Sequence, residues 1–145
     1  MKICIIIANY YPSISKDLFD GAKKLLMKNK IKNYKKIFVP GIIEIPIVIS
    51  KNINYYDAFI ALGCAIKGKT PHFNFISNAT TNAIMHLSIN HKKPIGNGII
   101  TCLNKKQAIE RSDPNKKNKG GEAAQATLSV LGILKNESKW TSAES

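Results

Sequence analysis

The chain has 145 residues, of which 44% are hydrophobic and 21% charged, a composition that suits one soluble globular domain over residues 1–145 and excludes a low-complexity chain. No apolar run approaches the roughly 18 residues needed to span a bilayer, and the N-terminal run Ile3–Ile7 is too short for a signal-peptide core. We therefore expect a cytoplasmic protein without membrane contacts.

The net charge of +13 comes almost entirely from lysine, because Arg111 is the only arginine among 22 basic residues. A basic surface attracts nucleic acids and small anions alike. The lysines are spread over the whole chain, however, and no segment interleaves them with aromatic residues. A nucleic-acid-binding protein stays open as an alternative function, but we expect no nucleic-acid partner.

Short apolar runs alternate with helical periodicities, which is typical of βαβ units. After a first strand at Ile3–Ala8 we expect a helix from about Ser15 to Asn29, with Ser15 as its N-cap. Further strands are expected at Lys36–Val39, Ala58–Ile66 and Ile95–Cys102. Further helices are expected at four places: one begins near Ile43, two cover His72–Asn90 and Lys105–Arg111, and the last runs from Glu122 to about Leu134. The stripe expected to face the sheet from the His72–Asn90 helix comprises Ile76, Ala79, Ala83 and Leu87. This order predicts a three-layer α/β/α sandwich with a four-stranded parallel sheet and a frayed tail after about residue 135.

Ligands of such sheets bind beyond the carboxyl ends of the strands. That rule selects the loops that follow the four expected strands, Ala8–Ser15, Val39–Pro46, Ile66–Phe73 and Thr101–Asn104. The first loop holds two tyrosines, Tyr10 and Tyr11, and either ring can stack on a planar heterocycle or merely cap the edge of the core. Glu44, in the first turn of a helix, can accept hydrogen bonds from ligand hydroxyls or be an ordinary first-turn acid.

The third loop has the composition of an anion site. Gly68, Thr70 and the following helix N-terminus offer N–H groups and a hydroxyl, and Lys69 adds charge. His72 can exchange a proton near neutral pH, or it can simply be the residue that starts the helix. Arg111 carries the planar guanidinium that bidentate phosphate recognition requires, although one arginine can also occur by chance.

The three cysteines, Cys4, Cys64 and Cys102, each lie in an apolar strand-like run. Their spacing matches no zinc pattern, and an odd number disfavours a disulfide framework. We expect small buried hydrophobic side chains, and no metal site or cofactor.

Taken together, these segments resemble the lumazine synthase family, from about Ile3 to Leu134. The resemblance is carried by PGIIEIP (Pro40–Pro46), GKTPHF (Gly68–Phe73) and QAIER followed by NKGGEAA (Gln107–Arg111, Asn118–Ala124). It implies a flavodoxin-like fold and a transferase that condenses 5-amino-6-(D-ribitylamino)uracil with 3,4-dihydroxy-2-butanone 4-phosphate. The product is 6,7-dimethyl-8-ribityllumazine, the precursor of riboflavin, and phosphate and water are released.

The resemblance also implies roles for individual residues. Tyr10 stacks on the heterocycle, Glu44 holds the ribityl chain and His72 transfers protons. Substrate binding through the backbone is implied for Ile42, Ile43, Cys64, Ala65 and Ile66. The phosphate is held by Lys69, Thr70 and Arg111. Lys119 lies close to the site, and Asn97 lies on the wall supplied by a neighbouring subunit. Many members carry an aromatic residue at the position of Asn97, which here can offer only an amide hydrogen bond.

Assembly follows from the same resemblance. The family forms homopentamers, and Arg111 reaches the site from a neighbouring subunit. Some members build larger shells with an N-terminal segment that this chain lacks, so we expect a free pentamer or a pair of pentamers. Riboflavin synthase is a candidate partner. The alternative from another class is a flavodoxin-like module that holds a flavin or nucleotide without turnover.

Overall fold

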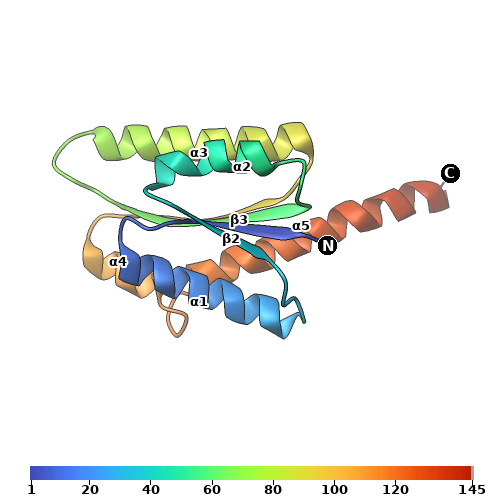
Figure 1. Ribbon diagram of the computed structural model, residues 1–145, viewed down its shortest axis with the longest axis horizontal. Helices are drawn as coiled ribbons and strands as arrows, with labels where there is room; N and C mark the ends of the chain where they lie inside the picture. Colours follow the sequence, from blue (N-terminus) through green and yellow to red (C-terminus); the bar gives the residue numbers. More distant parts are fainter. Residues whose placement is uncertain (145) are drawn as a thin grey trace.

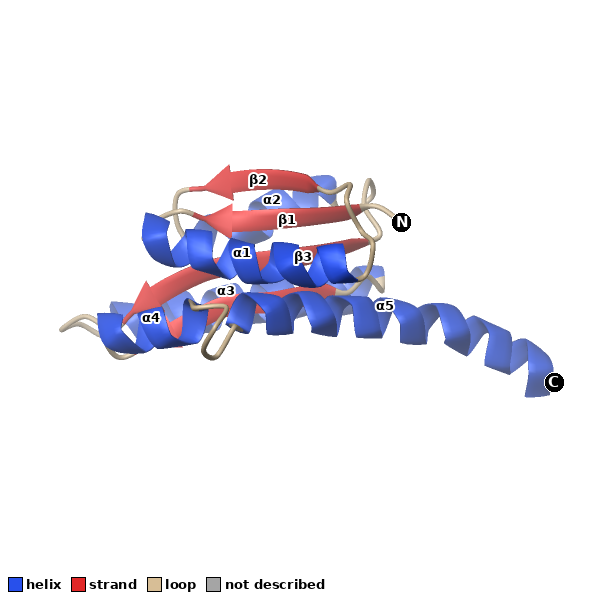
Figure 2. Cartoon of the chain, turned by 90° about the horizontal axis from the view of Figure 1, so that it is seen from below, coloured by secondary structure: helices blue, strands red, loops and turns tan. Residues whose placement is uncertain are grey.

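The computed structural model describes residues 1–144, with side chains described through residue 136. Its centre is one sheet of four strands, β1 (Ile3–Ala8), β2 (Lys35–Val39), β3 (Ala58–Ile66) and β4 (Ile95–Cys102). The strands pair in parallel in the order β2-β1-β3-β4, so that β2 and β4 form the two edges (Figure 2). The predicted four-stranded parallel sheet is therefore confirmed.

Helices cover both faces of the sheet (Figure 1). One layer consists of α1 (Pro12–Lys28), α4 (Lys105–Ser112) and α5 (Lys119–Glu144). The other consists of α2 (Ile45–Asn52), entered through the 3-10 turn η1 (Ile42–Glu44), and α3 (His72–His91). The structure thus has the three α/β/α layers that the sequence predicts.

The two middle strands are buried on both faces, because a parallel sheet between two helical layers has no face exposed to water. All of β1 is buried, as is β3 from Ala58 to Cys64. Alternate residues point into two separate cores, with Ile5 and Leu62 packing toward α1 and α5, and Ile6 and Phe59 toward α2 and α3. Each fully buried side chain of this size contributes about 1.5–3 kcal/mol.

The start of α1 differs from the prediction. The helix begins at Pro12, with Tyr11 as its N-cap, because proline is well suited to the first turn of a helix, where no backbone N–H is required. The expected N-cap Ser15 lies inside the helix and is buried, and its hydroxyl donates a hydrogen bond to the carbonyl of Ala8 at the end of β1. The N-cap prediction was wrong, and the serine instead ties α1 to the sheet.

Two other helices differ in detail. On α3 two residues of the predicted stripe, Ile76 and Leu87, pack against the core as expected. Ala79 is exposed instead, and the most deeply buried residues are Thr80 and Ile84. The last helix begins at Lys119 rather than Glu122 and continues to Glu144, beyond the expected end near Leu134. We also expected the tail to fray after about residue 135. The side chains from residue 137 onward lie outside the described part of the chain, so the fraying stays a prediction.

Among the helices that the structure describes, none combines the length and apolar character that crossing a membrane requires.

Candidate active site

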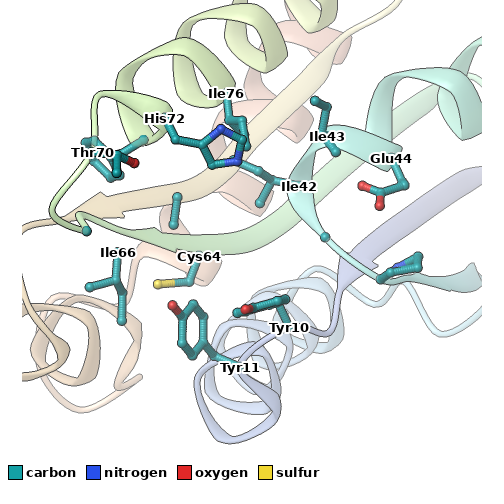
Figure 3. A pocket seen from close by; sticks show the side chains of 15 residues that line it. Tyr10, Tyr11, Ile42, Ile43, Glu44, Cys64, Ile66, Thr70, His72 and Ile76 are labelled. Atoms are coloured by element: carbon teal, nitrogen blue, oxygen red, sulfur yellow. The ribbon is translucent and has the colours of Figure 1, made fainter.

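A pocket of about 450 Å³ opens beyond the carboxyl ends of β1 and β3, as the rule for parallel sheets predicts (Figure 3). The loops after β1, β2 and β3 and the first turns of α3 form its walls. The lining residues are Tyr10, Tyr11, Pro40, Gly41, Ile42, Ile43, Glu44, Cys64, Ala65, Ile66, Gly68, Thr70, His72, Phe73 and Ile76. The size is in the range of small-molecule sites.

Two tyrosines form the aromatic side of this pocket. The side chain of Tyr10 is 71% exposed, and its ring meets the ring of Tyr11 edge to face, with the centroids 4.9 Å apart and the planes at 74°. Tyr11 also packs against the core beneath α1, so it fixes the orientation of its neighbour. This arrangement leaves the Tyr10 ring accessible to a planar ligand.

Glu44 brings an unsatisfied carboxylate to the pocket. It lies at the end of η1, where its backbone N–H donates to the carbonyl of Gly41 over 3.2 Å. Its Oε2 atom is buried and has no hydrogen-bond partner among the described residues. A buried acceptor without a donor is costly, so a ligand that offers hydroxyl or N–H groups gains free energy here.

The end of β3 forms an uncharged floor. Burial, with a smaller contribution from the adjacent Cys102 thiol, raises the pKa of the Cys64 thiol to about 12. Burial also raises the pKa of the Tyr11 phenol, with Cys64 and Tyr10 as smaller causes. Both groups are therefore neutral at physiological pH, and Cys64 lacks the thiolate that a nucleophile needs. All three cysteines are buried and free, as the sequence predicts.

The loop between β3 and α3 supplies the polar side across from the tyrosines. Thr70 precedes α3, and His72 is the first residue of that helix. Figure 3 shows the His72 imidazole directed into the pocket, with Thr70 beside it. Lys69 is exposed in the same loop but is not among the residues that line the pocket.

The remaining predicted site residues surround a second cavity of about 500 Å³. This cavity is lined by Asn97, Ile99, Ile100, Thr101, Arg111, Lys117, Lys119 and Glu122. The Nη1 atom of Arg111 donates to the Thr101 carbonyl over 2.9 Å, and the Oδ1 atom of Asn97 accepts from the Ile99 N–H over 3.0 Å. Within one subunit, Arg111 therefore lines a different cavity from His72.

The sequence prediction assigned the stacking role to Tyr10 and considered Tyr11 only as the other tyrosine of that loop. It did not single out Phe73 or Ile76, although all three residues line the first pocket. Phe73 and Ile76 follow His72 by one and four positions on α3, so the helical period would have placed Ile76 on the face of His72. Among the described residues, no group of three or more His, Cys, Asp or Glu side chains is arranged to hold a metal ion.

Comparisons with known proteins identify the family of this chain. The sequence profile of the family described as 6,7-dimethyl-8-ribityllumazine synthase matches residues 1–135. The chain is 44% identical over 143 residues to the 6,7-dimethyl-8-ribityllumazine synthase of Buchnera aphidicola, covering 95% of this chain and 90% of the relative. It is 42% identical over 139 residues to the synthase of Bartonella henselae, covering 93% and 89% of the two chains. For the synthase of Zymomonas mobilis the identity is 38% over 136 residues, with 92% and 96% covered. The chain therefore belongs to the 6,7-dimethyl-8-ribityllumazine synthase family.

Proposed function

We propose that this chain condenses 5-amino-6-(D-ribitylamino)uracil with 3,4-dihydroxy-2-butanone 4-phosphate to 6,7-dimethyl-8-ribityllumazine, in clefts shared by neighbouring copies of the chain. The observation that carries the proposal is a carboxylate oxygen of Glu44 that has no hydrogen-bond partner in the part of the chain that the structure describes. The same pocket also holds an exposed aromatic ring and an imidazole. A polyol chain attached to a planar ring complements these groups, because it offers hydroxyl donors and a face for stacking.

The first pocket binds the pyrimidine. Tyr10 stacks on the ring, Glu44 accepts hydrogen bonds from the ribityl hydroxyls, and backbone groups of Ile42 and Ile43 and of the segment Cys64–Ile66 line the rest. The floor at the end of β3 is uncharged, which suits a neutral heterocycle. Stacking and hydrogen bonding together fix the reactive amine in one orientation.

His72 moves the protons of the reaction. The amine attacks the ketone to form an imine with loss of a first water, and phosphate is eliminated. Tautomerisation and ring closure with loss of a second water complete the product. Each step adds or removes a proton, and an imidazole does both near neutral pH. Holding two reactants together contributes up to about 7–11 kcal/mol, and proton transfer typically adds 10²–10⁴-fold, so positioning is the larger effect.

Lys69 and Thr70 hold the phosphate together with Arg111 from the neighbouring copy, while Asn97 and Lys119 of that copy close the cleft. The separation of Arg111 from His72 within one subunit supports a site between copies. Large exposed apolar side chains on α2 and α3 support close association of subunits. They are Ile47, Phe75, Met85 and Ile89. We propose that the chain forms a homopentamer in the cytoplasm. Riboflavin synthase is a candidate partner of this pentamer.

The decisive experiment mixes the purified protein with both substrates and follows the absorbance of the lumazine product. We expect formation well above the rate of the uncatalysed mixture. A protein that binds the product or a flavin without accelerating the reaction would instead be a binding module and would refute the proposal.

A further inference from the structure

The second cavity carries more positive charge than one phosphate-binding arginine requires. Arg111, Lys117 and Lys119 all line it, and Glu122 is its only carboxylate. A phosphate monoester carries about −1.5 to −2 charges at neutral pH, so one guanidinium does not neutralise it. The question is which of the two lysines supplies the remaining charge.

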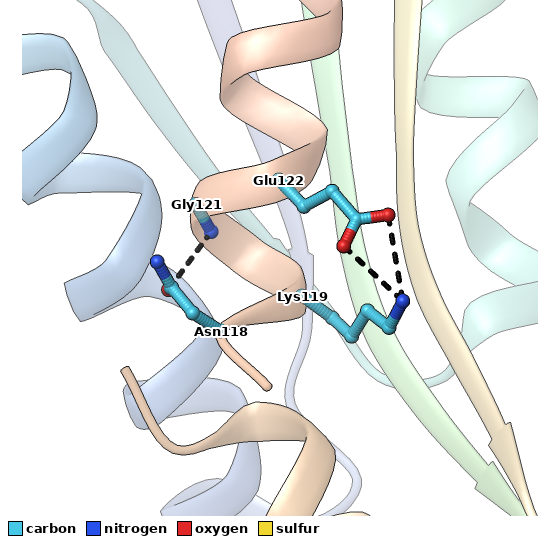
Figure 4. A network of polar contacts seen from close by, with 4 residues as sticks. All are labelled: Asn118, Lys119, Gly121 and Glu122. Atoms are coloured by element: carbon cyan, nitrogen blue, oxygen red, sulfur yellow. Dashed lines mark hydrogen bonds and ion pairs between the residues drawn. The ribbon is translucent and has the colours of Figure 1, made fainter. Parts of the chain in front are cut away.

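Lys119 is already engaged within its own helix (Figure 4). Its ammonium lies 3.2 Å from Oε2 and 3.4 Å from Oε1 of Glu122, one turn further along α5. The two charges largely cancel at any distance longer than their separation. An anion in the cavity would therefore gain little from Lys119 unless this ion pair opened.

Lys117 has no such partner. Among the described residues no carboxylate lies within ion-pair range of its ammonium, and the side chain is exposed. Its backbone is nevertheless fixed, since its N–H donates to the Glu110 carbonyl over 3.1 Å and the N–H of Asn118 donates to the Asp113 carbonyl over 3.0 Å. The tight turn from Asp113 to Asn118 thus holds the root of Lys117 at the rim of the cavity.

The neighbouring Lys116 serves as an internal comparison. It belongs to the same turn and is also exposed, yet it lines a different cavity, with Lys105, Lys106, Ile109 and Glu110. The turn therefore directs two consecutive lysines to different surfaces, and of these two Lys117 is the one that shares a cavity with Arg111.

We propose that Lys117 is a second phosphate-binding residue beside Arg111 and determines the preference for the phosphorylated substrate. Lys119 contributes little to phosphate binding, because its charge is paired with that of Glu122. The inference rests on the proposed function, because the phosphate is that of the ketone substrate. Arg111 supplies directed hydrogen bonds, and Lys117 supplies a mobile point charge that follows the phosphate as it leaves.

The test compares Lys117→Gln with the matched control Lys116→Gln, since both remove one charge from the same turn. For Lys117→Gln we expect the KM for the phosphorylated ketone and the inhibition constant of inorganic phosphate to rise about tenfold, with an unchanged KM for the pyrimidine. For Lys116→Gln we expect wild-type values. Glu122→Gln should lower the KM for the ketone about two- to threefold, because it releases Lys119.

Equal constants for Lys117→Gln and Lys116→Gln, in an assay where the wild-type protein is active, would overturn the role of Lys117 and leave the proposed function intact. A parallel rise in both substrate KM values for Lys117→Gln would also overturn it, since that pattern indicates a general disturbance of the site. A wild-type protein without activity would refute the proposed function itself. Thermal unfolding of each variant shows that the comparison is made between folded proteins.

Discussion

The buried Oε2 atom of Glu44 has no hydrogen-bond partner among the described residues. A substitution of Glu44 should therefore weaken substrate binding without a matching loss of stability. We predict that Glu44→Gln raises the KM for the pyrimidine about 10- to 100-fold, because hydrogen bonds to a charged acceptor contribute about 1.5–3 kcal/mol. The same change should leave the free energy of unfolding nearly equal, since in the described residues the buried Oε2 atom has no donor whose hydrogen bond would be lost. Substrate kinetics and urea unfolding of the one variant check both halves. A variant that loses stability but retains its KM would assign Glu44 to the fold rather than to the ligand.

Cys64 gives the stability a pH dependence of known sign. The folded pKa of about 12 lies above the ordinary value of 9.0, so the neutral thiol stabilises the fold fully below pH 9, and this contribution is lost as the pH rises toward 12. We predict that wild-type protein loses on the order of 1 kcal/mol more than Cys64→Ala between pH 8 and pH 10. Urea unfolding at several pH values measures the difference. Parallel pH profiles for the two proteins would contradict the burial of this thiol.

Single residues at strand ends were the most predictable part of the site. Tyr10, Glu44 and Thr70 line the pocket because the carboxyl ends of parallel strands lie together whatever the loop sequences are. The sequence offered both Tyr10 and Tyr11 but could not divide their roles, since these depend on the edge-to-face contact between the two rings, which no local pattern specifies. The loops alone did not divide the site residues between two cavities, whereas the family resemblance implied that Arg111 and Asn97 come from a neighbouring subunit.

At the level of elements, the contact between α1 and α5 depends on glycine. A Cβ atom added to Gly120 would overlap the backbone carbonyl of Leu18 in α1, which cannot move aside as a flexible side chain can. We predict that Gly120→Ala destabilises the protein by about 1–3 kcal/mol or more. Thermal or urea unfolding measures the loss.

Gly132 on the same helix is the matched control, because an added Cβ atom there meets nothing within 4 Å. Gly132→Ala should stabilise the protein by about 0.5–1 kcal/mol, the ordinary gain from replacing glycine in a helix. If both substitutions shifted stability in the same direction, packing of α5 against α1 would not be the reason for Gly120.

The strands were easier to predict than the helix ends. The continuous apolar run Ala58–Ile66 predicted both ends of β3 correctly. A strand that is covered by helices on both faces needs apolar residues at consecutive positions, and such a run is easy to recognise. The start of α5 was missed because Asn118, with φ at 49°, uses its side chain to accept from the N–H of Gly121, and the pair Gly120-Gly121 reads locally as a loop. Tertiary packing against α1 overrides that local preference.

At the scale of the assembly, a site shared between copies predicts complementation. His72→Ala and Arg111→Ala should each be nearly inactive, but mixed oligomers place an intact imidazole beside an intact guanidinium in roughly a quarter of the sites. Co-expression of the two variants, followed by assay of the mixed oligomer, tests this. A double variant carrying both substitutions on one chain is the control and should stay inactive when mixed with itself. Failure of the mixed oligomer to regain activity would place the whole site within one subunit.

The exposed margin of β2 has a consequence for how concentrated solutions of this protein behave. A bare edge strand offers its backbone to any other strand, and such pairing is a common route to fibrillar aggregation. Here consecutive lysines, Lys35 and Lys36, lie on that strand, and the ammonium of Lys36 rests 4.4 Å from the ring centroid of Phe19 and 5.5 Å from that of Phe38. The Lys36 cation thus lies over aromatic rings at the edge of the sheet. Part of the lysine excess therefore disfavours the pairing of β2 strands from different molecules.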